Sequence, residues 1–158
     1  MIGDALIRWT ARLFVACYVG RLCVDAARWR DRISQQFARR LWMVGGILFL
    51  MHVAAGFHFQ HDWNHAAAFE HVRLRTLHQT GWNSGIGLYI NEAFGVLWLT
   101  DAILWCRRLD WSEQRLPYWI VQASFAFLML QATAFFGPPF WMPVCVVIGI
   151  TLVSIRRR

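Results

Sequence analysis

The chain has 158 residues, of which 58% are apolar and 16% are charged, and its formal net charge is +7. All sixteen basic residues are arginine, which excludes chemistry that needs a lysine, such as Schiff-base formation or a P-loop phosphate site. The arginines lie at the ends of long apolar blocks, as membrane topology requires, and no basic surface interleaved with aromatic residues is left for nucleic acid. We therefore interpret the chain as an integral membrane protein.

The first half of the chain contains two apolar blocks of roughly the 20 residues needed to cross a bilayer. The first covers about 5–25 and the second about 41–60, and the arginine-rich stretch 28–40 between them is predicted to be a polar linker. A histidine-rich segment, 58–80, continues from the second block and is helix-compatible until Gly81, which is expected to end the helix.

The second half contains three further apolar blocks, at about 86–106, 118–136 and 141–155. A charged loop at 107–117 follows the first of them, and the last ends in three arginines. The sequence thus predicts an all-α fold: one domain, 1–158, that forms a transmembrane bundle of about five helices.

The distribution of arginines predicts the orientation of this bundle. With the N-terminus outside and the C-terminus inside, the stretch 28–40, the loop 107–117 and the C-terminal residues place eleven arginines on the cytoplasmic side. Only Arg73 and Arg75 fall in the outer segment. This asymmetry is typical of an inner membrane of bacteria, and it puts the histidine-rich segment on the outer face.

Four charged residues within the predicted spans require partners, because an ionisable group inside a bilayer is costly. The first and third spans run in the same direction, so equal depth predicts the pairs Arg12–Glu92 and Arg21–Asp101. Arg21 also has Asp25 at the i, i+4 position of its own helix. Glu92 has a second interpretation, as a carboxylate that completes a site on the histidine-rich segment.

The histidine-rich segment is the candidate functional site. His58, His61, Asp62 and His65 stand at i, i+3, i+4 and i+7, so that on one continuous helix they share a face. Three imidazoles and a carboxylate suit Zn, Cu or Fe. We expect a transition-metal site formed by these residues, with Glu92 as a further carboxylate, while His71 and His78 point away by helical phase. Interfacial hydrogen bonding without a metal is the alternative.

Haem or chlorin ranks below a metal ion as the cofactor. A transmembrane haem is usually held by histidines from two helices, and only His52 lies deep in a predicted span. A single axial histidine, or ligation within an oligomer, remains open.

The stretch HVAAGFHFQHDWNHAAAFEH, with the following GWNSGIGLYINEAFGVLWLTDAILW, resembles a group of small polytopic bacterial membrane proteins without an assigned function. The resemblance covers about a third of the chain and implies no activity, but it marks the histidine-rich segment as the signature of that group.

Three functions are compatible with this pattern. The first is an accessory protein of a membrane redox complex, in contact with the bilayer and with other membrane subunits or a second copy. The second is a metal-dependent membrane enzyme that acts on a lipid or apolar substrate at the outer leaflet. The third is a metal-ion or proton transporter, for which the inverted repeats usual in transporters are not evident.

Overall fold

The computed structural model describes residues 2–107, 115–135 and 137–157. Nearly all of these residues are helical and none is in a β-strand, which confirms the all-α prediction. The elements are α1 (Ile2–Ala26), α2 (Arg32–His61), α3 (His65–Thr80), α4 (Gly87–Arg107), α5 (Arg115–Leu130), the π-helical η2 (Gln131–Phe135) and α6 (Trp141–Arg157).

Each predicted apolar block corresponds to one helix, but the linker prediction is wrong. The stretch 28–40 is mostly helical, because α2 begins at Arg32. The Asp31 side chain caps that helix by accepting a hydrogen bond from the Ser34 backbone N–H at 2.9 Å. Most of the predicted charged loop at 107–117 lies outside the described residues.

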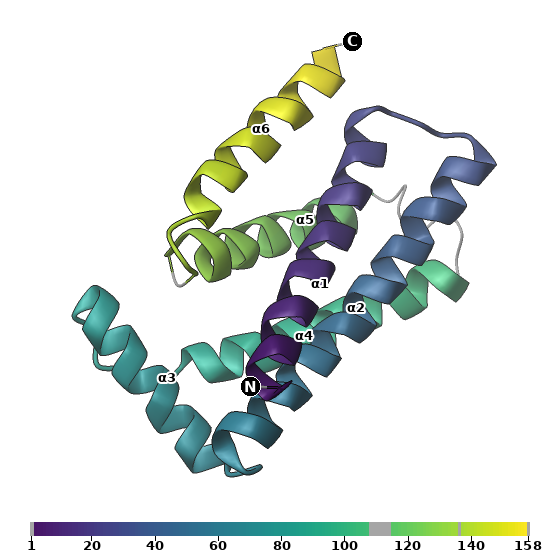
Figure 1. Cartoon of the computed structure of the whole chain (residues 1–158). Helices are drawn as coiled ribbons and strands as arrows, with labels where there is room; N and C mark the ends of the chain where they lie inside the picture. Colours follow the sequence, from purple (N-terminus) through teal and green to yellow (C-terminus); the bar gives the residue numbers. More distant parts are fainter. Residues whose placement is uncertain (1, 108–114, 136, 158) are drawn as a thin grey trace.

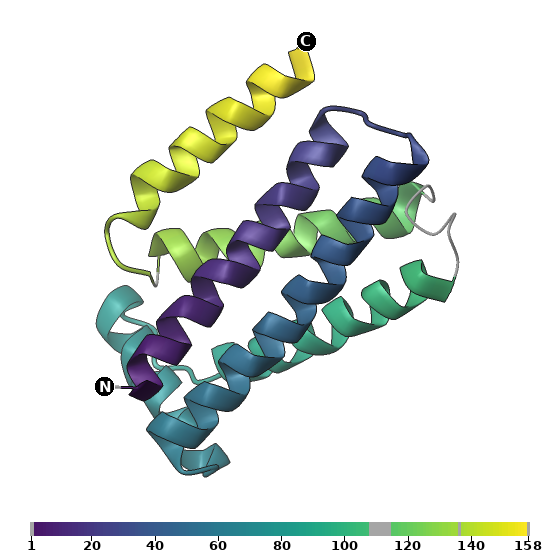
Figure 2. The same cartoon turned by 45° about the vertical axis from the view of Figure 1, so that its right-hand side comes forward.

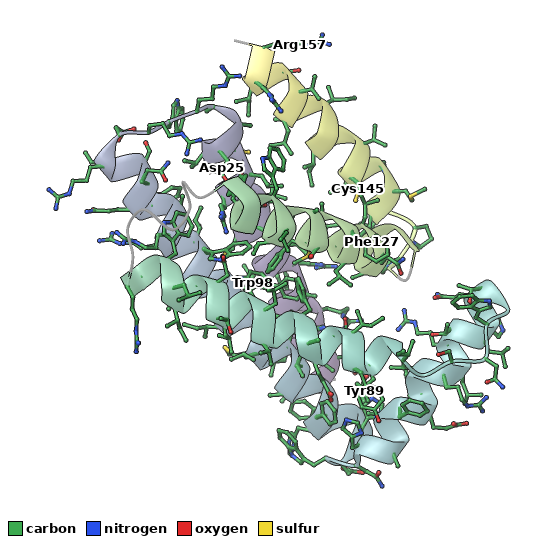
Figure 3. The ribbon with its side chains drawn as sticks, turned by 180° about the vertical axis from the view of Figure 1, so that it is seen from behind. Asp25, Tyr89, Trp98, Phe127, Cys145 and Arg157 are labelled. Atoms are coloured by element: carbon green, nitrogen blue, oxygen red, sulfur yellow. The ribbon has the colours of Figure 1, made fainter. Side chains whose placement is uncertain are left out.

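Aromatic side chains fill the centre of the molecule, where α1, α2, α4 and α5 meet. The fully buried Trp42, Trp98 and Phe125 come from three different helices, and their ring centres lie 4.5–5.0 Å apart. Hydrogen bonds orient both indoles: Trp98 Nε1 donates to the Trp42 carbonyl, and Trp42 Nε1 donates to Asp101. Figure 3 shows Trp98 at this central position.

α1 and α2 form an antiparallel pair that packs closely because α2 carries small residues at the contact. A Cβ added to Gly45 would lie 2.7 Å from the Trp98 ring of α4 and 3.1 Å from Cys17 of α1. Glycine at this position therefore lets both neighbouring helices approach α2.

The ends of the helices divide the molecule into two poles. The N-terminus and α3 lie at one pole, and the α1–α2 turn and the C-terminus lie at the other (Figures 1 and 2). The described arginines of the predicted cytoplasmic side lie close to the second pole: Arg28 and Arg30 in the turn, Arg32 at the start of α2, and Arg156 and Arg157 at the end of α6.

The outer surface of the bundle is unusually apolar. Large side chains at least 46% exposed occur on α4, α5 and α6: Val96, Ile103, Ile120, Phe127, Val147 and Ile150. No residue of α6 is buried among the described side chains. By contrast, five polar or charged side chains are at most 7% exposed: Thr10, Arg21, Asp101, Gln122 and Thr133.

Among the described helices, α2 alone is both long and apolar enough to meet a standard test for a membrane span. That property is also found in the core helix of a soluble protein and in a signal sequence. α4 carries three charged residues within its 21 residues, and the 16 residues of α5 continue into η2 as a separate π-helical segment.

Candidate functional site

The histidine-rich segment is not one continuous helix, contrary to the sequence prediction. α2 ends at His61, and Asp62 follows in the left-handed conformation with φ 46° and ψ 39°. Trp63 also has a positive φ, of 59°. Asn64 then starts α3, because its side chain accepts a hydrogen bond from the Ala67 backbone N–H. The break separates His65 from the helix that carries His58 and His61.

The break brings His61 of α2 next to His71 of α3. The two ring centres lie 5.1 Å apart with an interplanar angle of 75°. His61 is partly buried and His71 is exposed, so the pair is open to solvent. Helical phase would turn His71 away only if the segment were one straight helix, so the sequence analysis missed this partner.

His58 takes a different role, because its Nδ1 accepts a hydrogen bond from Trp63 Nε1 at 3.3 Å. This contact ties Trp63, the second residue after the helix end, back to the last turns of α2. The bond also commits one of the two imidazole nitrogens of His58.

His65, rather than a group of three histidines, meets Glu92 of α4. His65 Nε2–H donates to Glu92 Oε1 at 2.8 Å, and both side chains are more than a third exposed. Aromatic rings surround the imidazole: Phe57 lies 6.0 Å and Tyr89 5.6 Å from the His65 ring centre. Tyr89 marks the end of α4 that is nearest to α3 (Figure 3).

An open apolar groove leads to this pair, with a cavity volume of about 480 Å³. One face of α2 contributes residues at i, i+3, i+4 and i+7, and the α2–α3 junction contributes two more. The lining residues are Leu50, Val53, Ala54, Phe57, Trp63 and His65.

The exposed side of α3 is organised by a separate ion pair. Arg73 donates two hydrogen bonds to the Glu70 carboxylate and one to the Asn83 side chain. The hydrogen bond from Arg73 lowers the pKa of Glu70, and the same bond raises the pKa of Arg73. Arg73 is therefore held within α3 and the turn that follows it.

A buried charge centre joins α1 to α2, α4 and α5 near the opposite pole. Arg21 is 2% exposed and lies 3.6 Å from Asp25 and 3.7 Å from Asp101. Both predicted partners of Arg21 are thus confirmed. The guanidinium also stacks over Trp42 and Trp105, at 3.9 and 4.5 Å from the ring centres.

The other predicted ion pair, Arg12–Glu92, is wrong. Arg12 lies over the Trp9 and Phe140 rings instead, at 5.0 and 5.9 Å from their centres. Glu92 pairs with His65, because the turn after α2 folds α3 back to α4. Equal depth along the two helices therefore predicted the Arg21–Asp101 contact correctly but not the Arg12–Glu92 contact.

His52, the histidine deepest in a predicted span, has a structural partner. Its Nδ1–H donates to the Ile7 carbonyl of α1 at 3.0 Å, and Phe14 packs edge-on against its ring. This contact anchors the first turns of α1 to α2.

The predicted metal ligands are thus divided among separate contacts. His58 bonds to Trp63, His61 faces His71, Asp62 caps α2, and His65 bonds to Glu92. Within the described residues, no group of three or more His, Cys, Asp or Glu side chains is arranged to hold a metal ion. The signal that could have shown this division is Asn64, an N-cap residue directly before a helix-compatible run.

Comparisons with protein families, with curated proteins and with solved structures found no match for this chain.

Proposed function

We propose that this chain is an integral membrane protein that binds a transition-metal ion at its outer end through His61 and His71. The membrane part of the proposal rests on the distribution of polarity. Large apolar side chains cover the outside of α4, α5 and α6, while Arg21, Asp101 and Gln122 are buried. Large exposed apolar surfaces mark contact with another apolar phase, and buried charges with close partners are typical of membrane bundles.

Five membrane spans are compatible with the helix lengths. α4 has 21 residues, α6 has 17, and α5 runs on into η2 without a gap. A span of about 20 residues crosses roughly 30 Å of hydrocarbon. The grouping of arginines near the C-terminal pole supports an orientation with that pole in the cytoplasm, as in a bacterial inner membrane.

The distance between the His61 and His71 rings carries the metal part of the proposal. Zinc lies about 2.0–2.1 Å from an imidazole nitrogen, so two imidazoles on one tetrahedral ion have ring centres roughly 5 Å apart. The observed separation of 5.1 Å matches this value. Imidazole ligands suit Zn²⁺ and Cu²⁺, and water or a partner molecule would fill the remaining positions.

The test is metal binding by protein purified in detergent without a histidine tag. Equilibrium dialysis against Zn²⁺ or Cu²⁺, followed by elemental analysis, should give about one ion per chain. His61→Ala and His71→Ala should each lose most of this metal. His78→Ala, an exposed histidine on the same helix as His71, is the matched control and should keep it.

Two other variants distinguish binding by His61 and His71 from binding by the three histidines on the face predicted from the sequence. If His58→Ala and His65→Ala abolish binding while His71→Ala does not, the ligands are those on the sequence-predicted face. If the wild type binds no more metal than the His61→Ala/His71→Ala double variant, the metal proposal fails.

A further inference from the structure

The apolar groove on α2 ends at a polar group, the hydrogen-bonded pair of His65 and Glu92. Leu50, Val53, Ala54 and Phe57 form its length, and Trp63 and His65 close it at the α2–α3 junction. His65 is hydrogen-bonded to the Glu92 carboxylate, which is 38% exposed. A ligand that fills this groove therefore needs a long apolar part and a polar part at one end.

The polar end favours a cationic group over an anionic one. Glu92 supplies a carboxylate, and aromatic rings lie around its partner His65: Tyr89 lies 5.6 Å and Phe57 6.0 Å from the His65 ring centre, and Trp63 is stacked on Phe57 at 6.2 Å. Aromatic faces beside a carboxylate are the usual surroundings of a bound ammonium group. Arg73 of α3, which could attract a phosphate, is occupied by Glu70 and Asn83.

We infer that the groove holds one phospholipid with an ammonium head group, its acyl chain along α2 and its ammonium beside Glu92. This inference rests on the proposed membrane location, since the ligand is a component of the bilayer. The groove opens on the outside of α2, where Leu50 is 42% and Trp63 62% exposed, so the lipid can enter sideways from the outer leaflet. α1 covers a different face of α2, through contacts with Phe49, His52 and Phe59.

The experiment is a competition between two lipids for the full-length protein. Protein in detergent is mixed with equal amounts of phosphatidylethanolamine and phosphatidylglycerol, and the lipids that remain bound are counted by native mass spectrometry. We expect one tightly retained phosphatidylethanolamine per chain. The expected preference over phosphatidylglycerol is about threefold, because an exposed pair between an ammonium group and the Glu92 carboxylate contributes about 0.2–1 kcal/mol.

Three variants test the position of the lipid. Ala54→Trp fills the groove with a ring and should remove the retained lipid. Ala126→Trp makes the same change at an exposed alanine of α5, outside the groove, and should keep it. Glu92→Gln can still accept the His65 hydrogen bond and should keep a bound lipid while its head-group preference falls to about one.

Three results would overturn the inference. One is equal lipid retention by Ala54→Trp and Ala126→Trp, another is a preference for phosphatidylglycerol, and the third is a Glu92→Gln variant with unchanged preference. Extraction of cell membranes with alkaline carbonate distinguishes this failure from failure of the membrane proposal. Protein that stays in the membrane but retains no ammonium lipid contradicts this inference only, and protein released into the supernatant contradicts both.

Discussion

The role of a single charged residue in this molecule depends on the side chains that it contacts in the folded chain. Arg21 is the clearest case, because one guanidinium contacts Asp25, Asp101 and the faces of Trp42 and Trp105. A buried ion pair adds little net stability, since desolvation offsets the attraction, but removal of one partner leaves an uncompensated charge. The centre therefore specifies how α1 and α4 pack against each other.

Replacement of Arg21 by methionine should destabilise the fold by about 3–5 kcal/mol, because two carboxylates lose their cation. The Arg21→Met/Asp101→Asn double variant should recover part of this loss, which thermal unfolding in detergent can measure. Arg12→Met removes an exposed guanidinium and is the control, with little expected change. A double variant as unstable as the sum of the single changes would show that Arg21 and Asp101 are not coupled.

The Glu70–Arg73 pair predicts a pH dependence that is confined to α3. The folded-state pKa of Glu70 lies below its usual value because Arg73 donates hydrogen bonds to it. The contribution to stability is therefore full above the unfolded pKa of about 4.5 and is lost as the pH falls through the lower folded value. The hydrogen-exchange protection factors of the α3 amides, which correct for the intrinsic pH dependence of exchange, should fall over this range. Glu70→Gln should remove the pH dependence, and an unchanged profile in that variant would assign it to another group.

The contacts between helices depend on a small residue at one contact and on a break between two helices. Gly45 allows Trp98 and Cys17 to lie against α2, and the left-handed Asp62 and the positive φ of Trp63 redirect the chain into α3. The first feature brings three helices together, and the second brings His71 to His61 and His65 to Glu92. Both pairs of the candidate site thus depend on a helix break of three residues.

Gly45→Ala should therefore lower stability by about 1–3 kcal/mol, since the new methyl group would meet a fully buried indole that is held by a hydrogen bond. Gly56→Ala on the same helix is the matched control, because its Cβ would have no neighbour within 4 Å. That change should be neutral or stabilising by up to about 1 kcal/mol, since alanine favours helix. Equal effects of the two substitutions on unfolding in detergent would contradict the close approach of Trp98.

For the whole molecule, the described interior is mostly aromatic and aliphatic and includes one buried charge centre, while many large apolar side chains also lie on the outside. The two poles also differ, since the histidine pairs lie at the N-terminal pole and most described arginines lie near the other. If the protein lies in a membrane as proposed, this difference decides which side faces the cytoplasm.

A topology reporter tests that orientation. A fusion after Arg158 should be active with a reporter that works only in the cytoplasm, and a fusion at the N-terminus should be active with one that works only in the periplasm. A C-terminal fusion active in the periplasm would reverse the proposed orientation and would put His61 and His71 on the cytoplasmic side.

The sequence by itself determined the all-α class and the approximate positions of most helices, but not the start of α2 or its break from α3. Apolar blocks, arginine clusters, Gly81 as a helix end and the pairing of Arg21 were all readable, because they depend on residues close in the chain or on the cost of a buried charge. The tertiary structure alone decided which histidines meet. Two positive φ angles at Asp62 and Trp63 separate His65 from the predicted face and bring in His71, and no periodicity in the sequence encodes a change of helix direction.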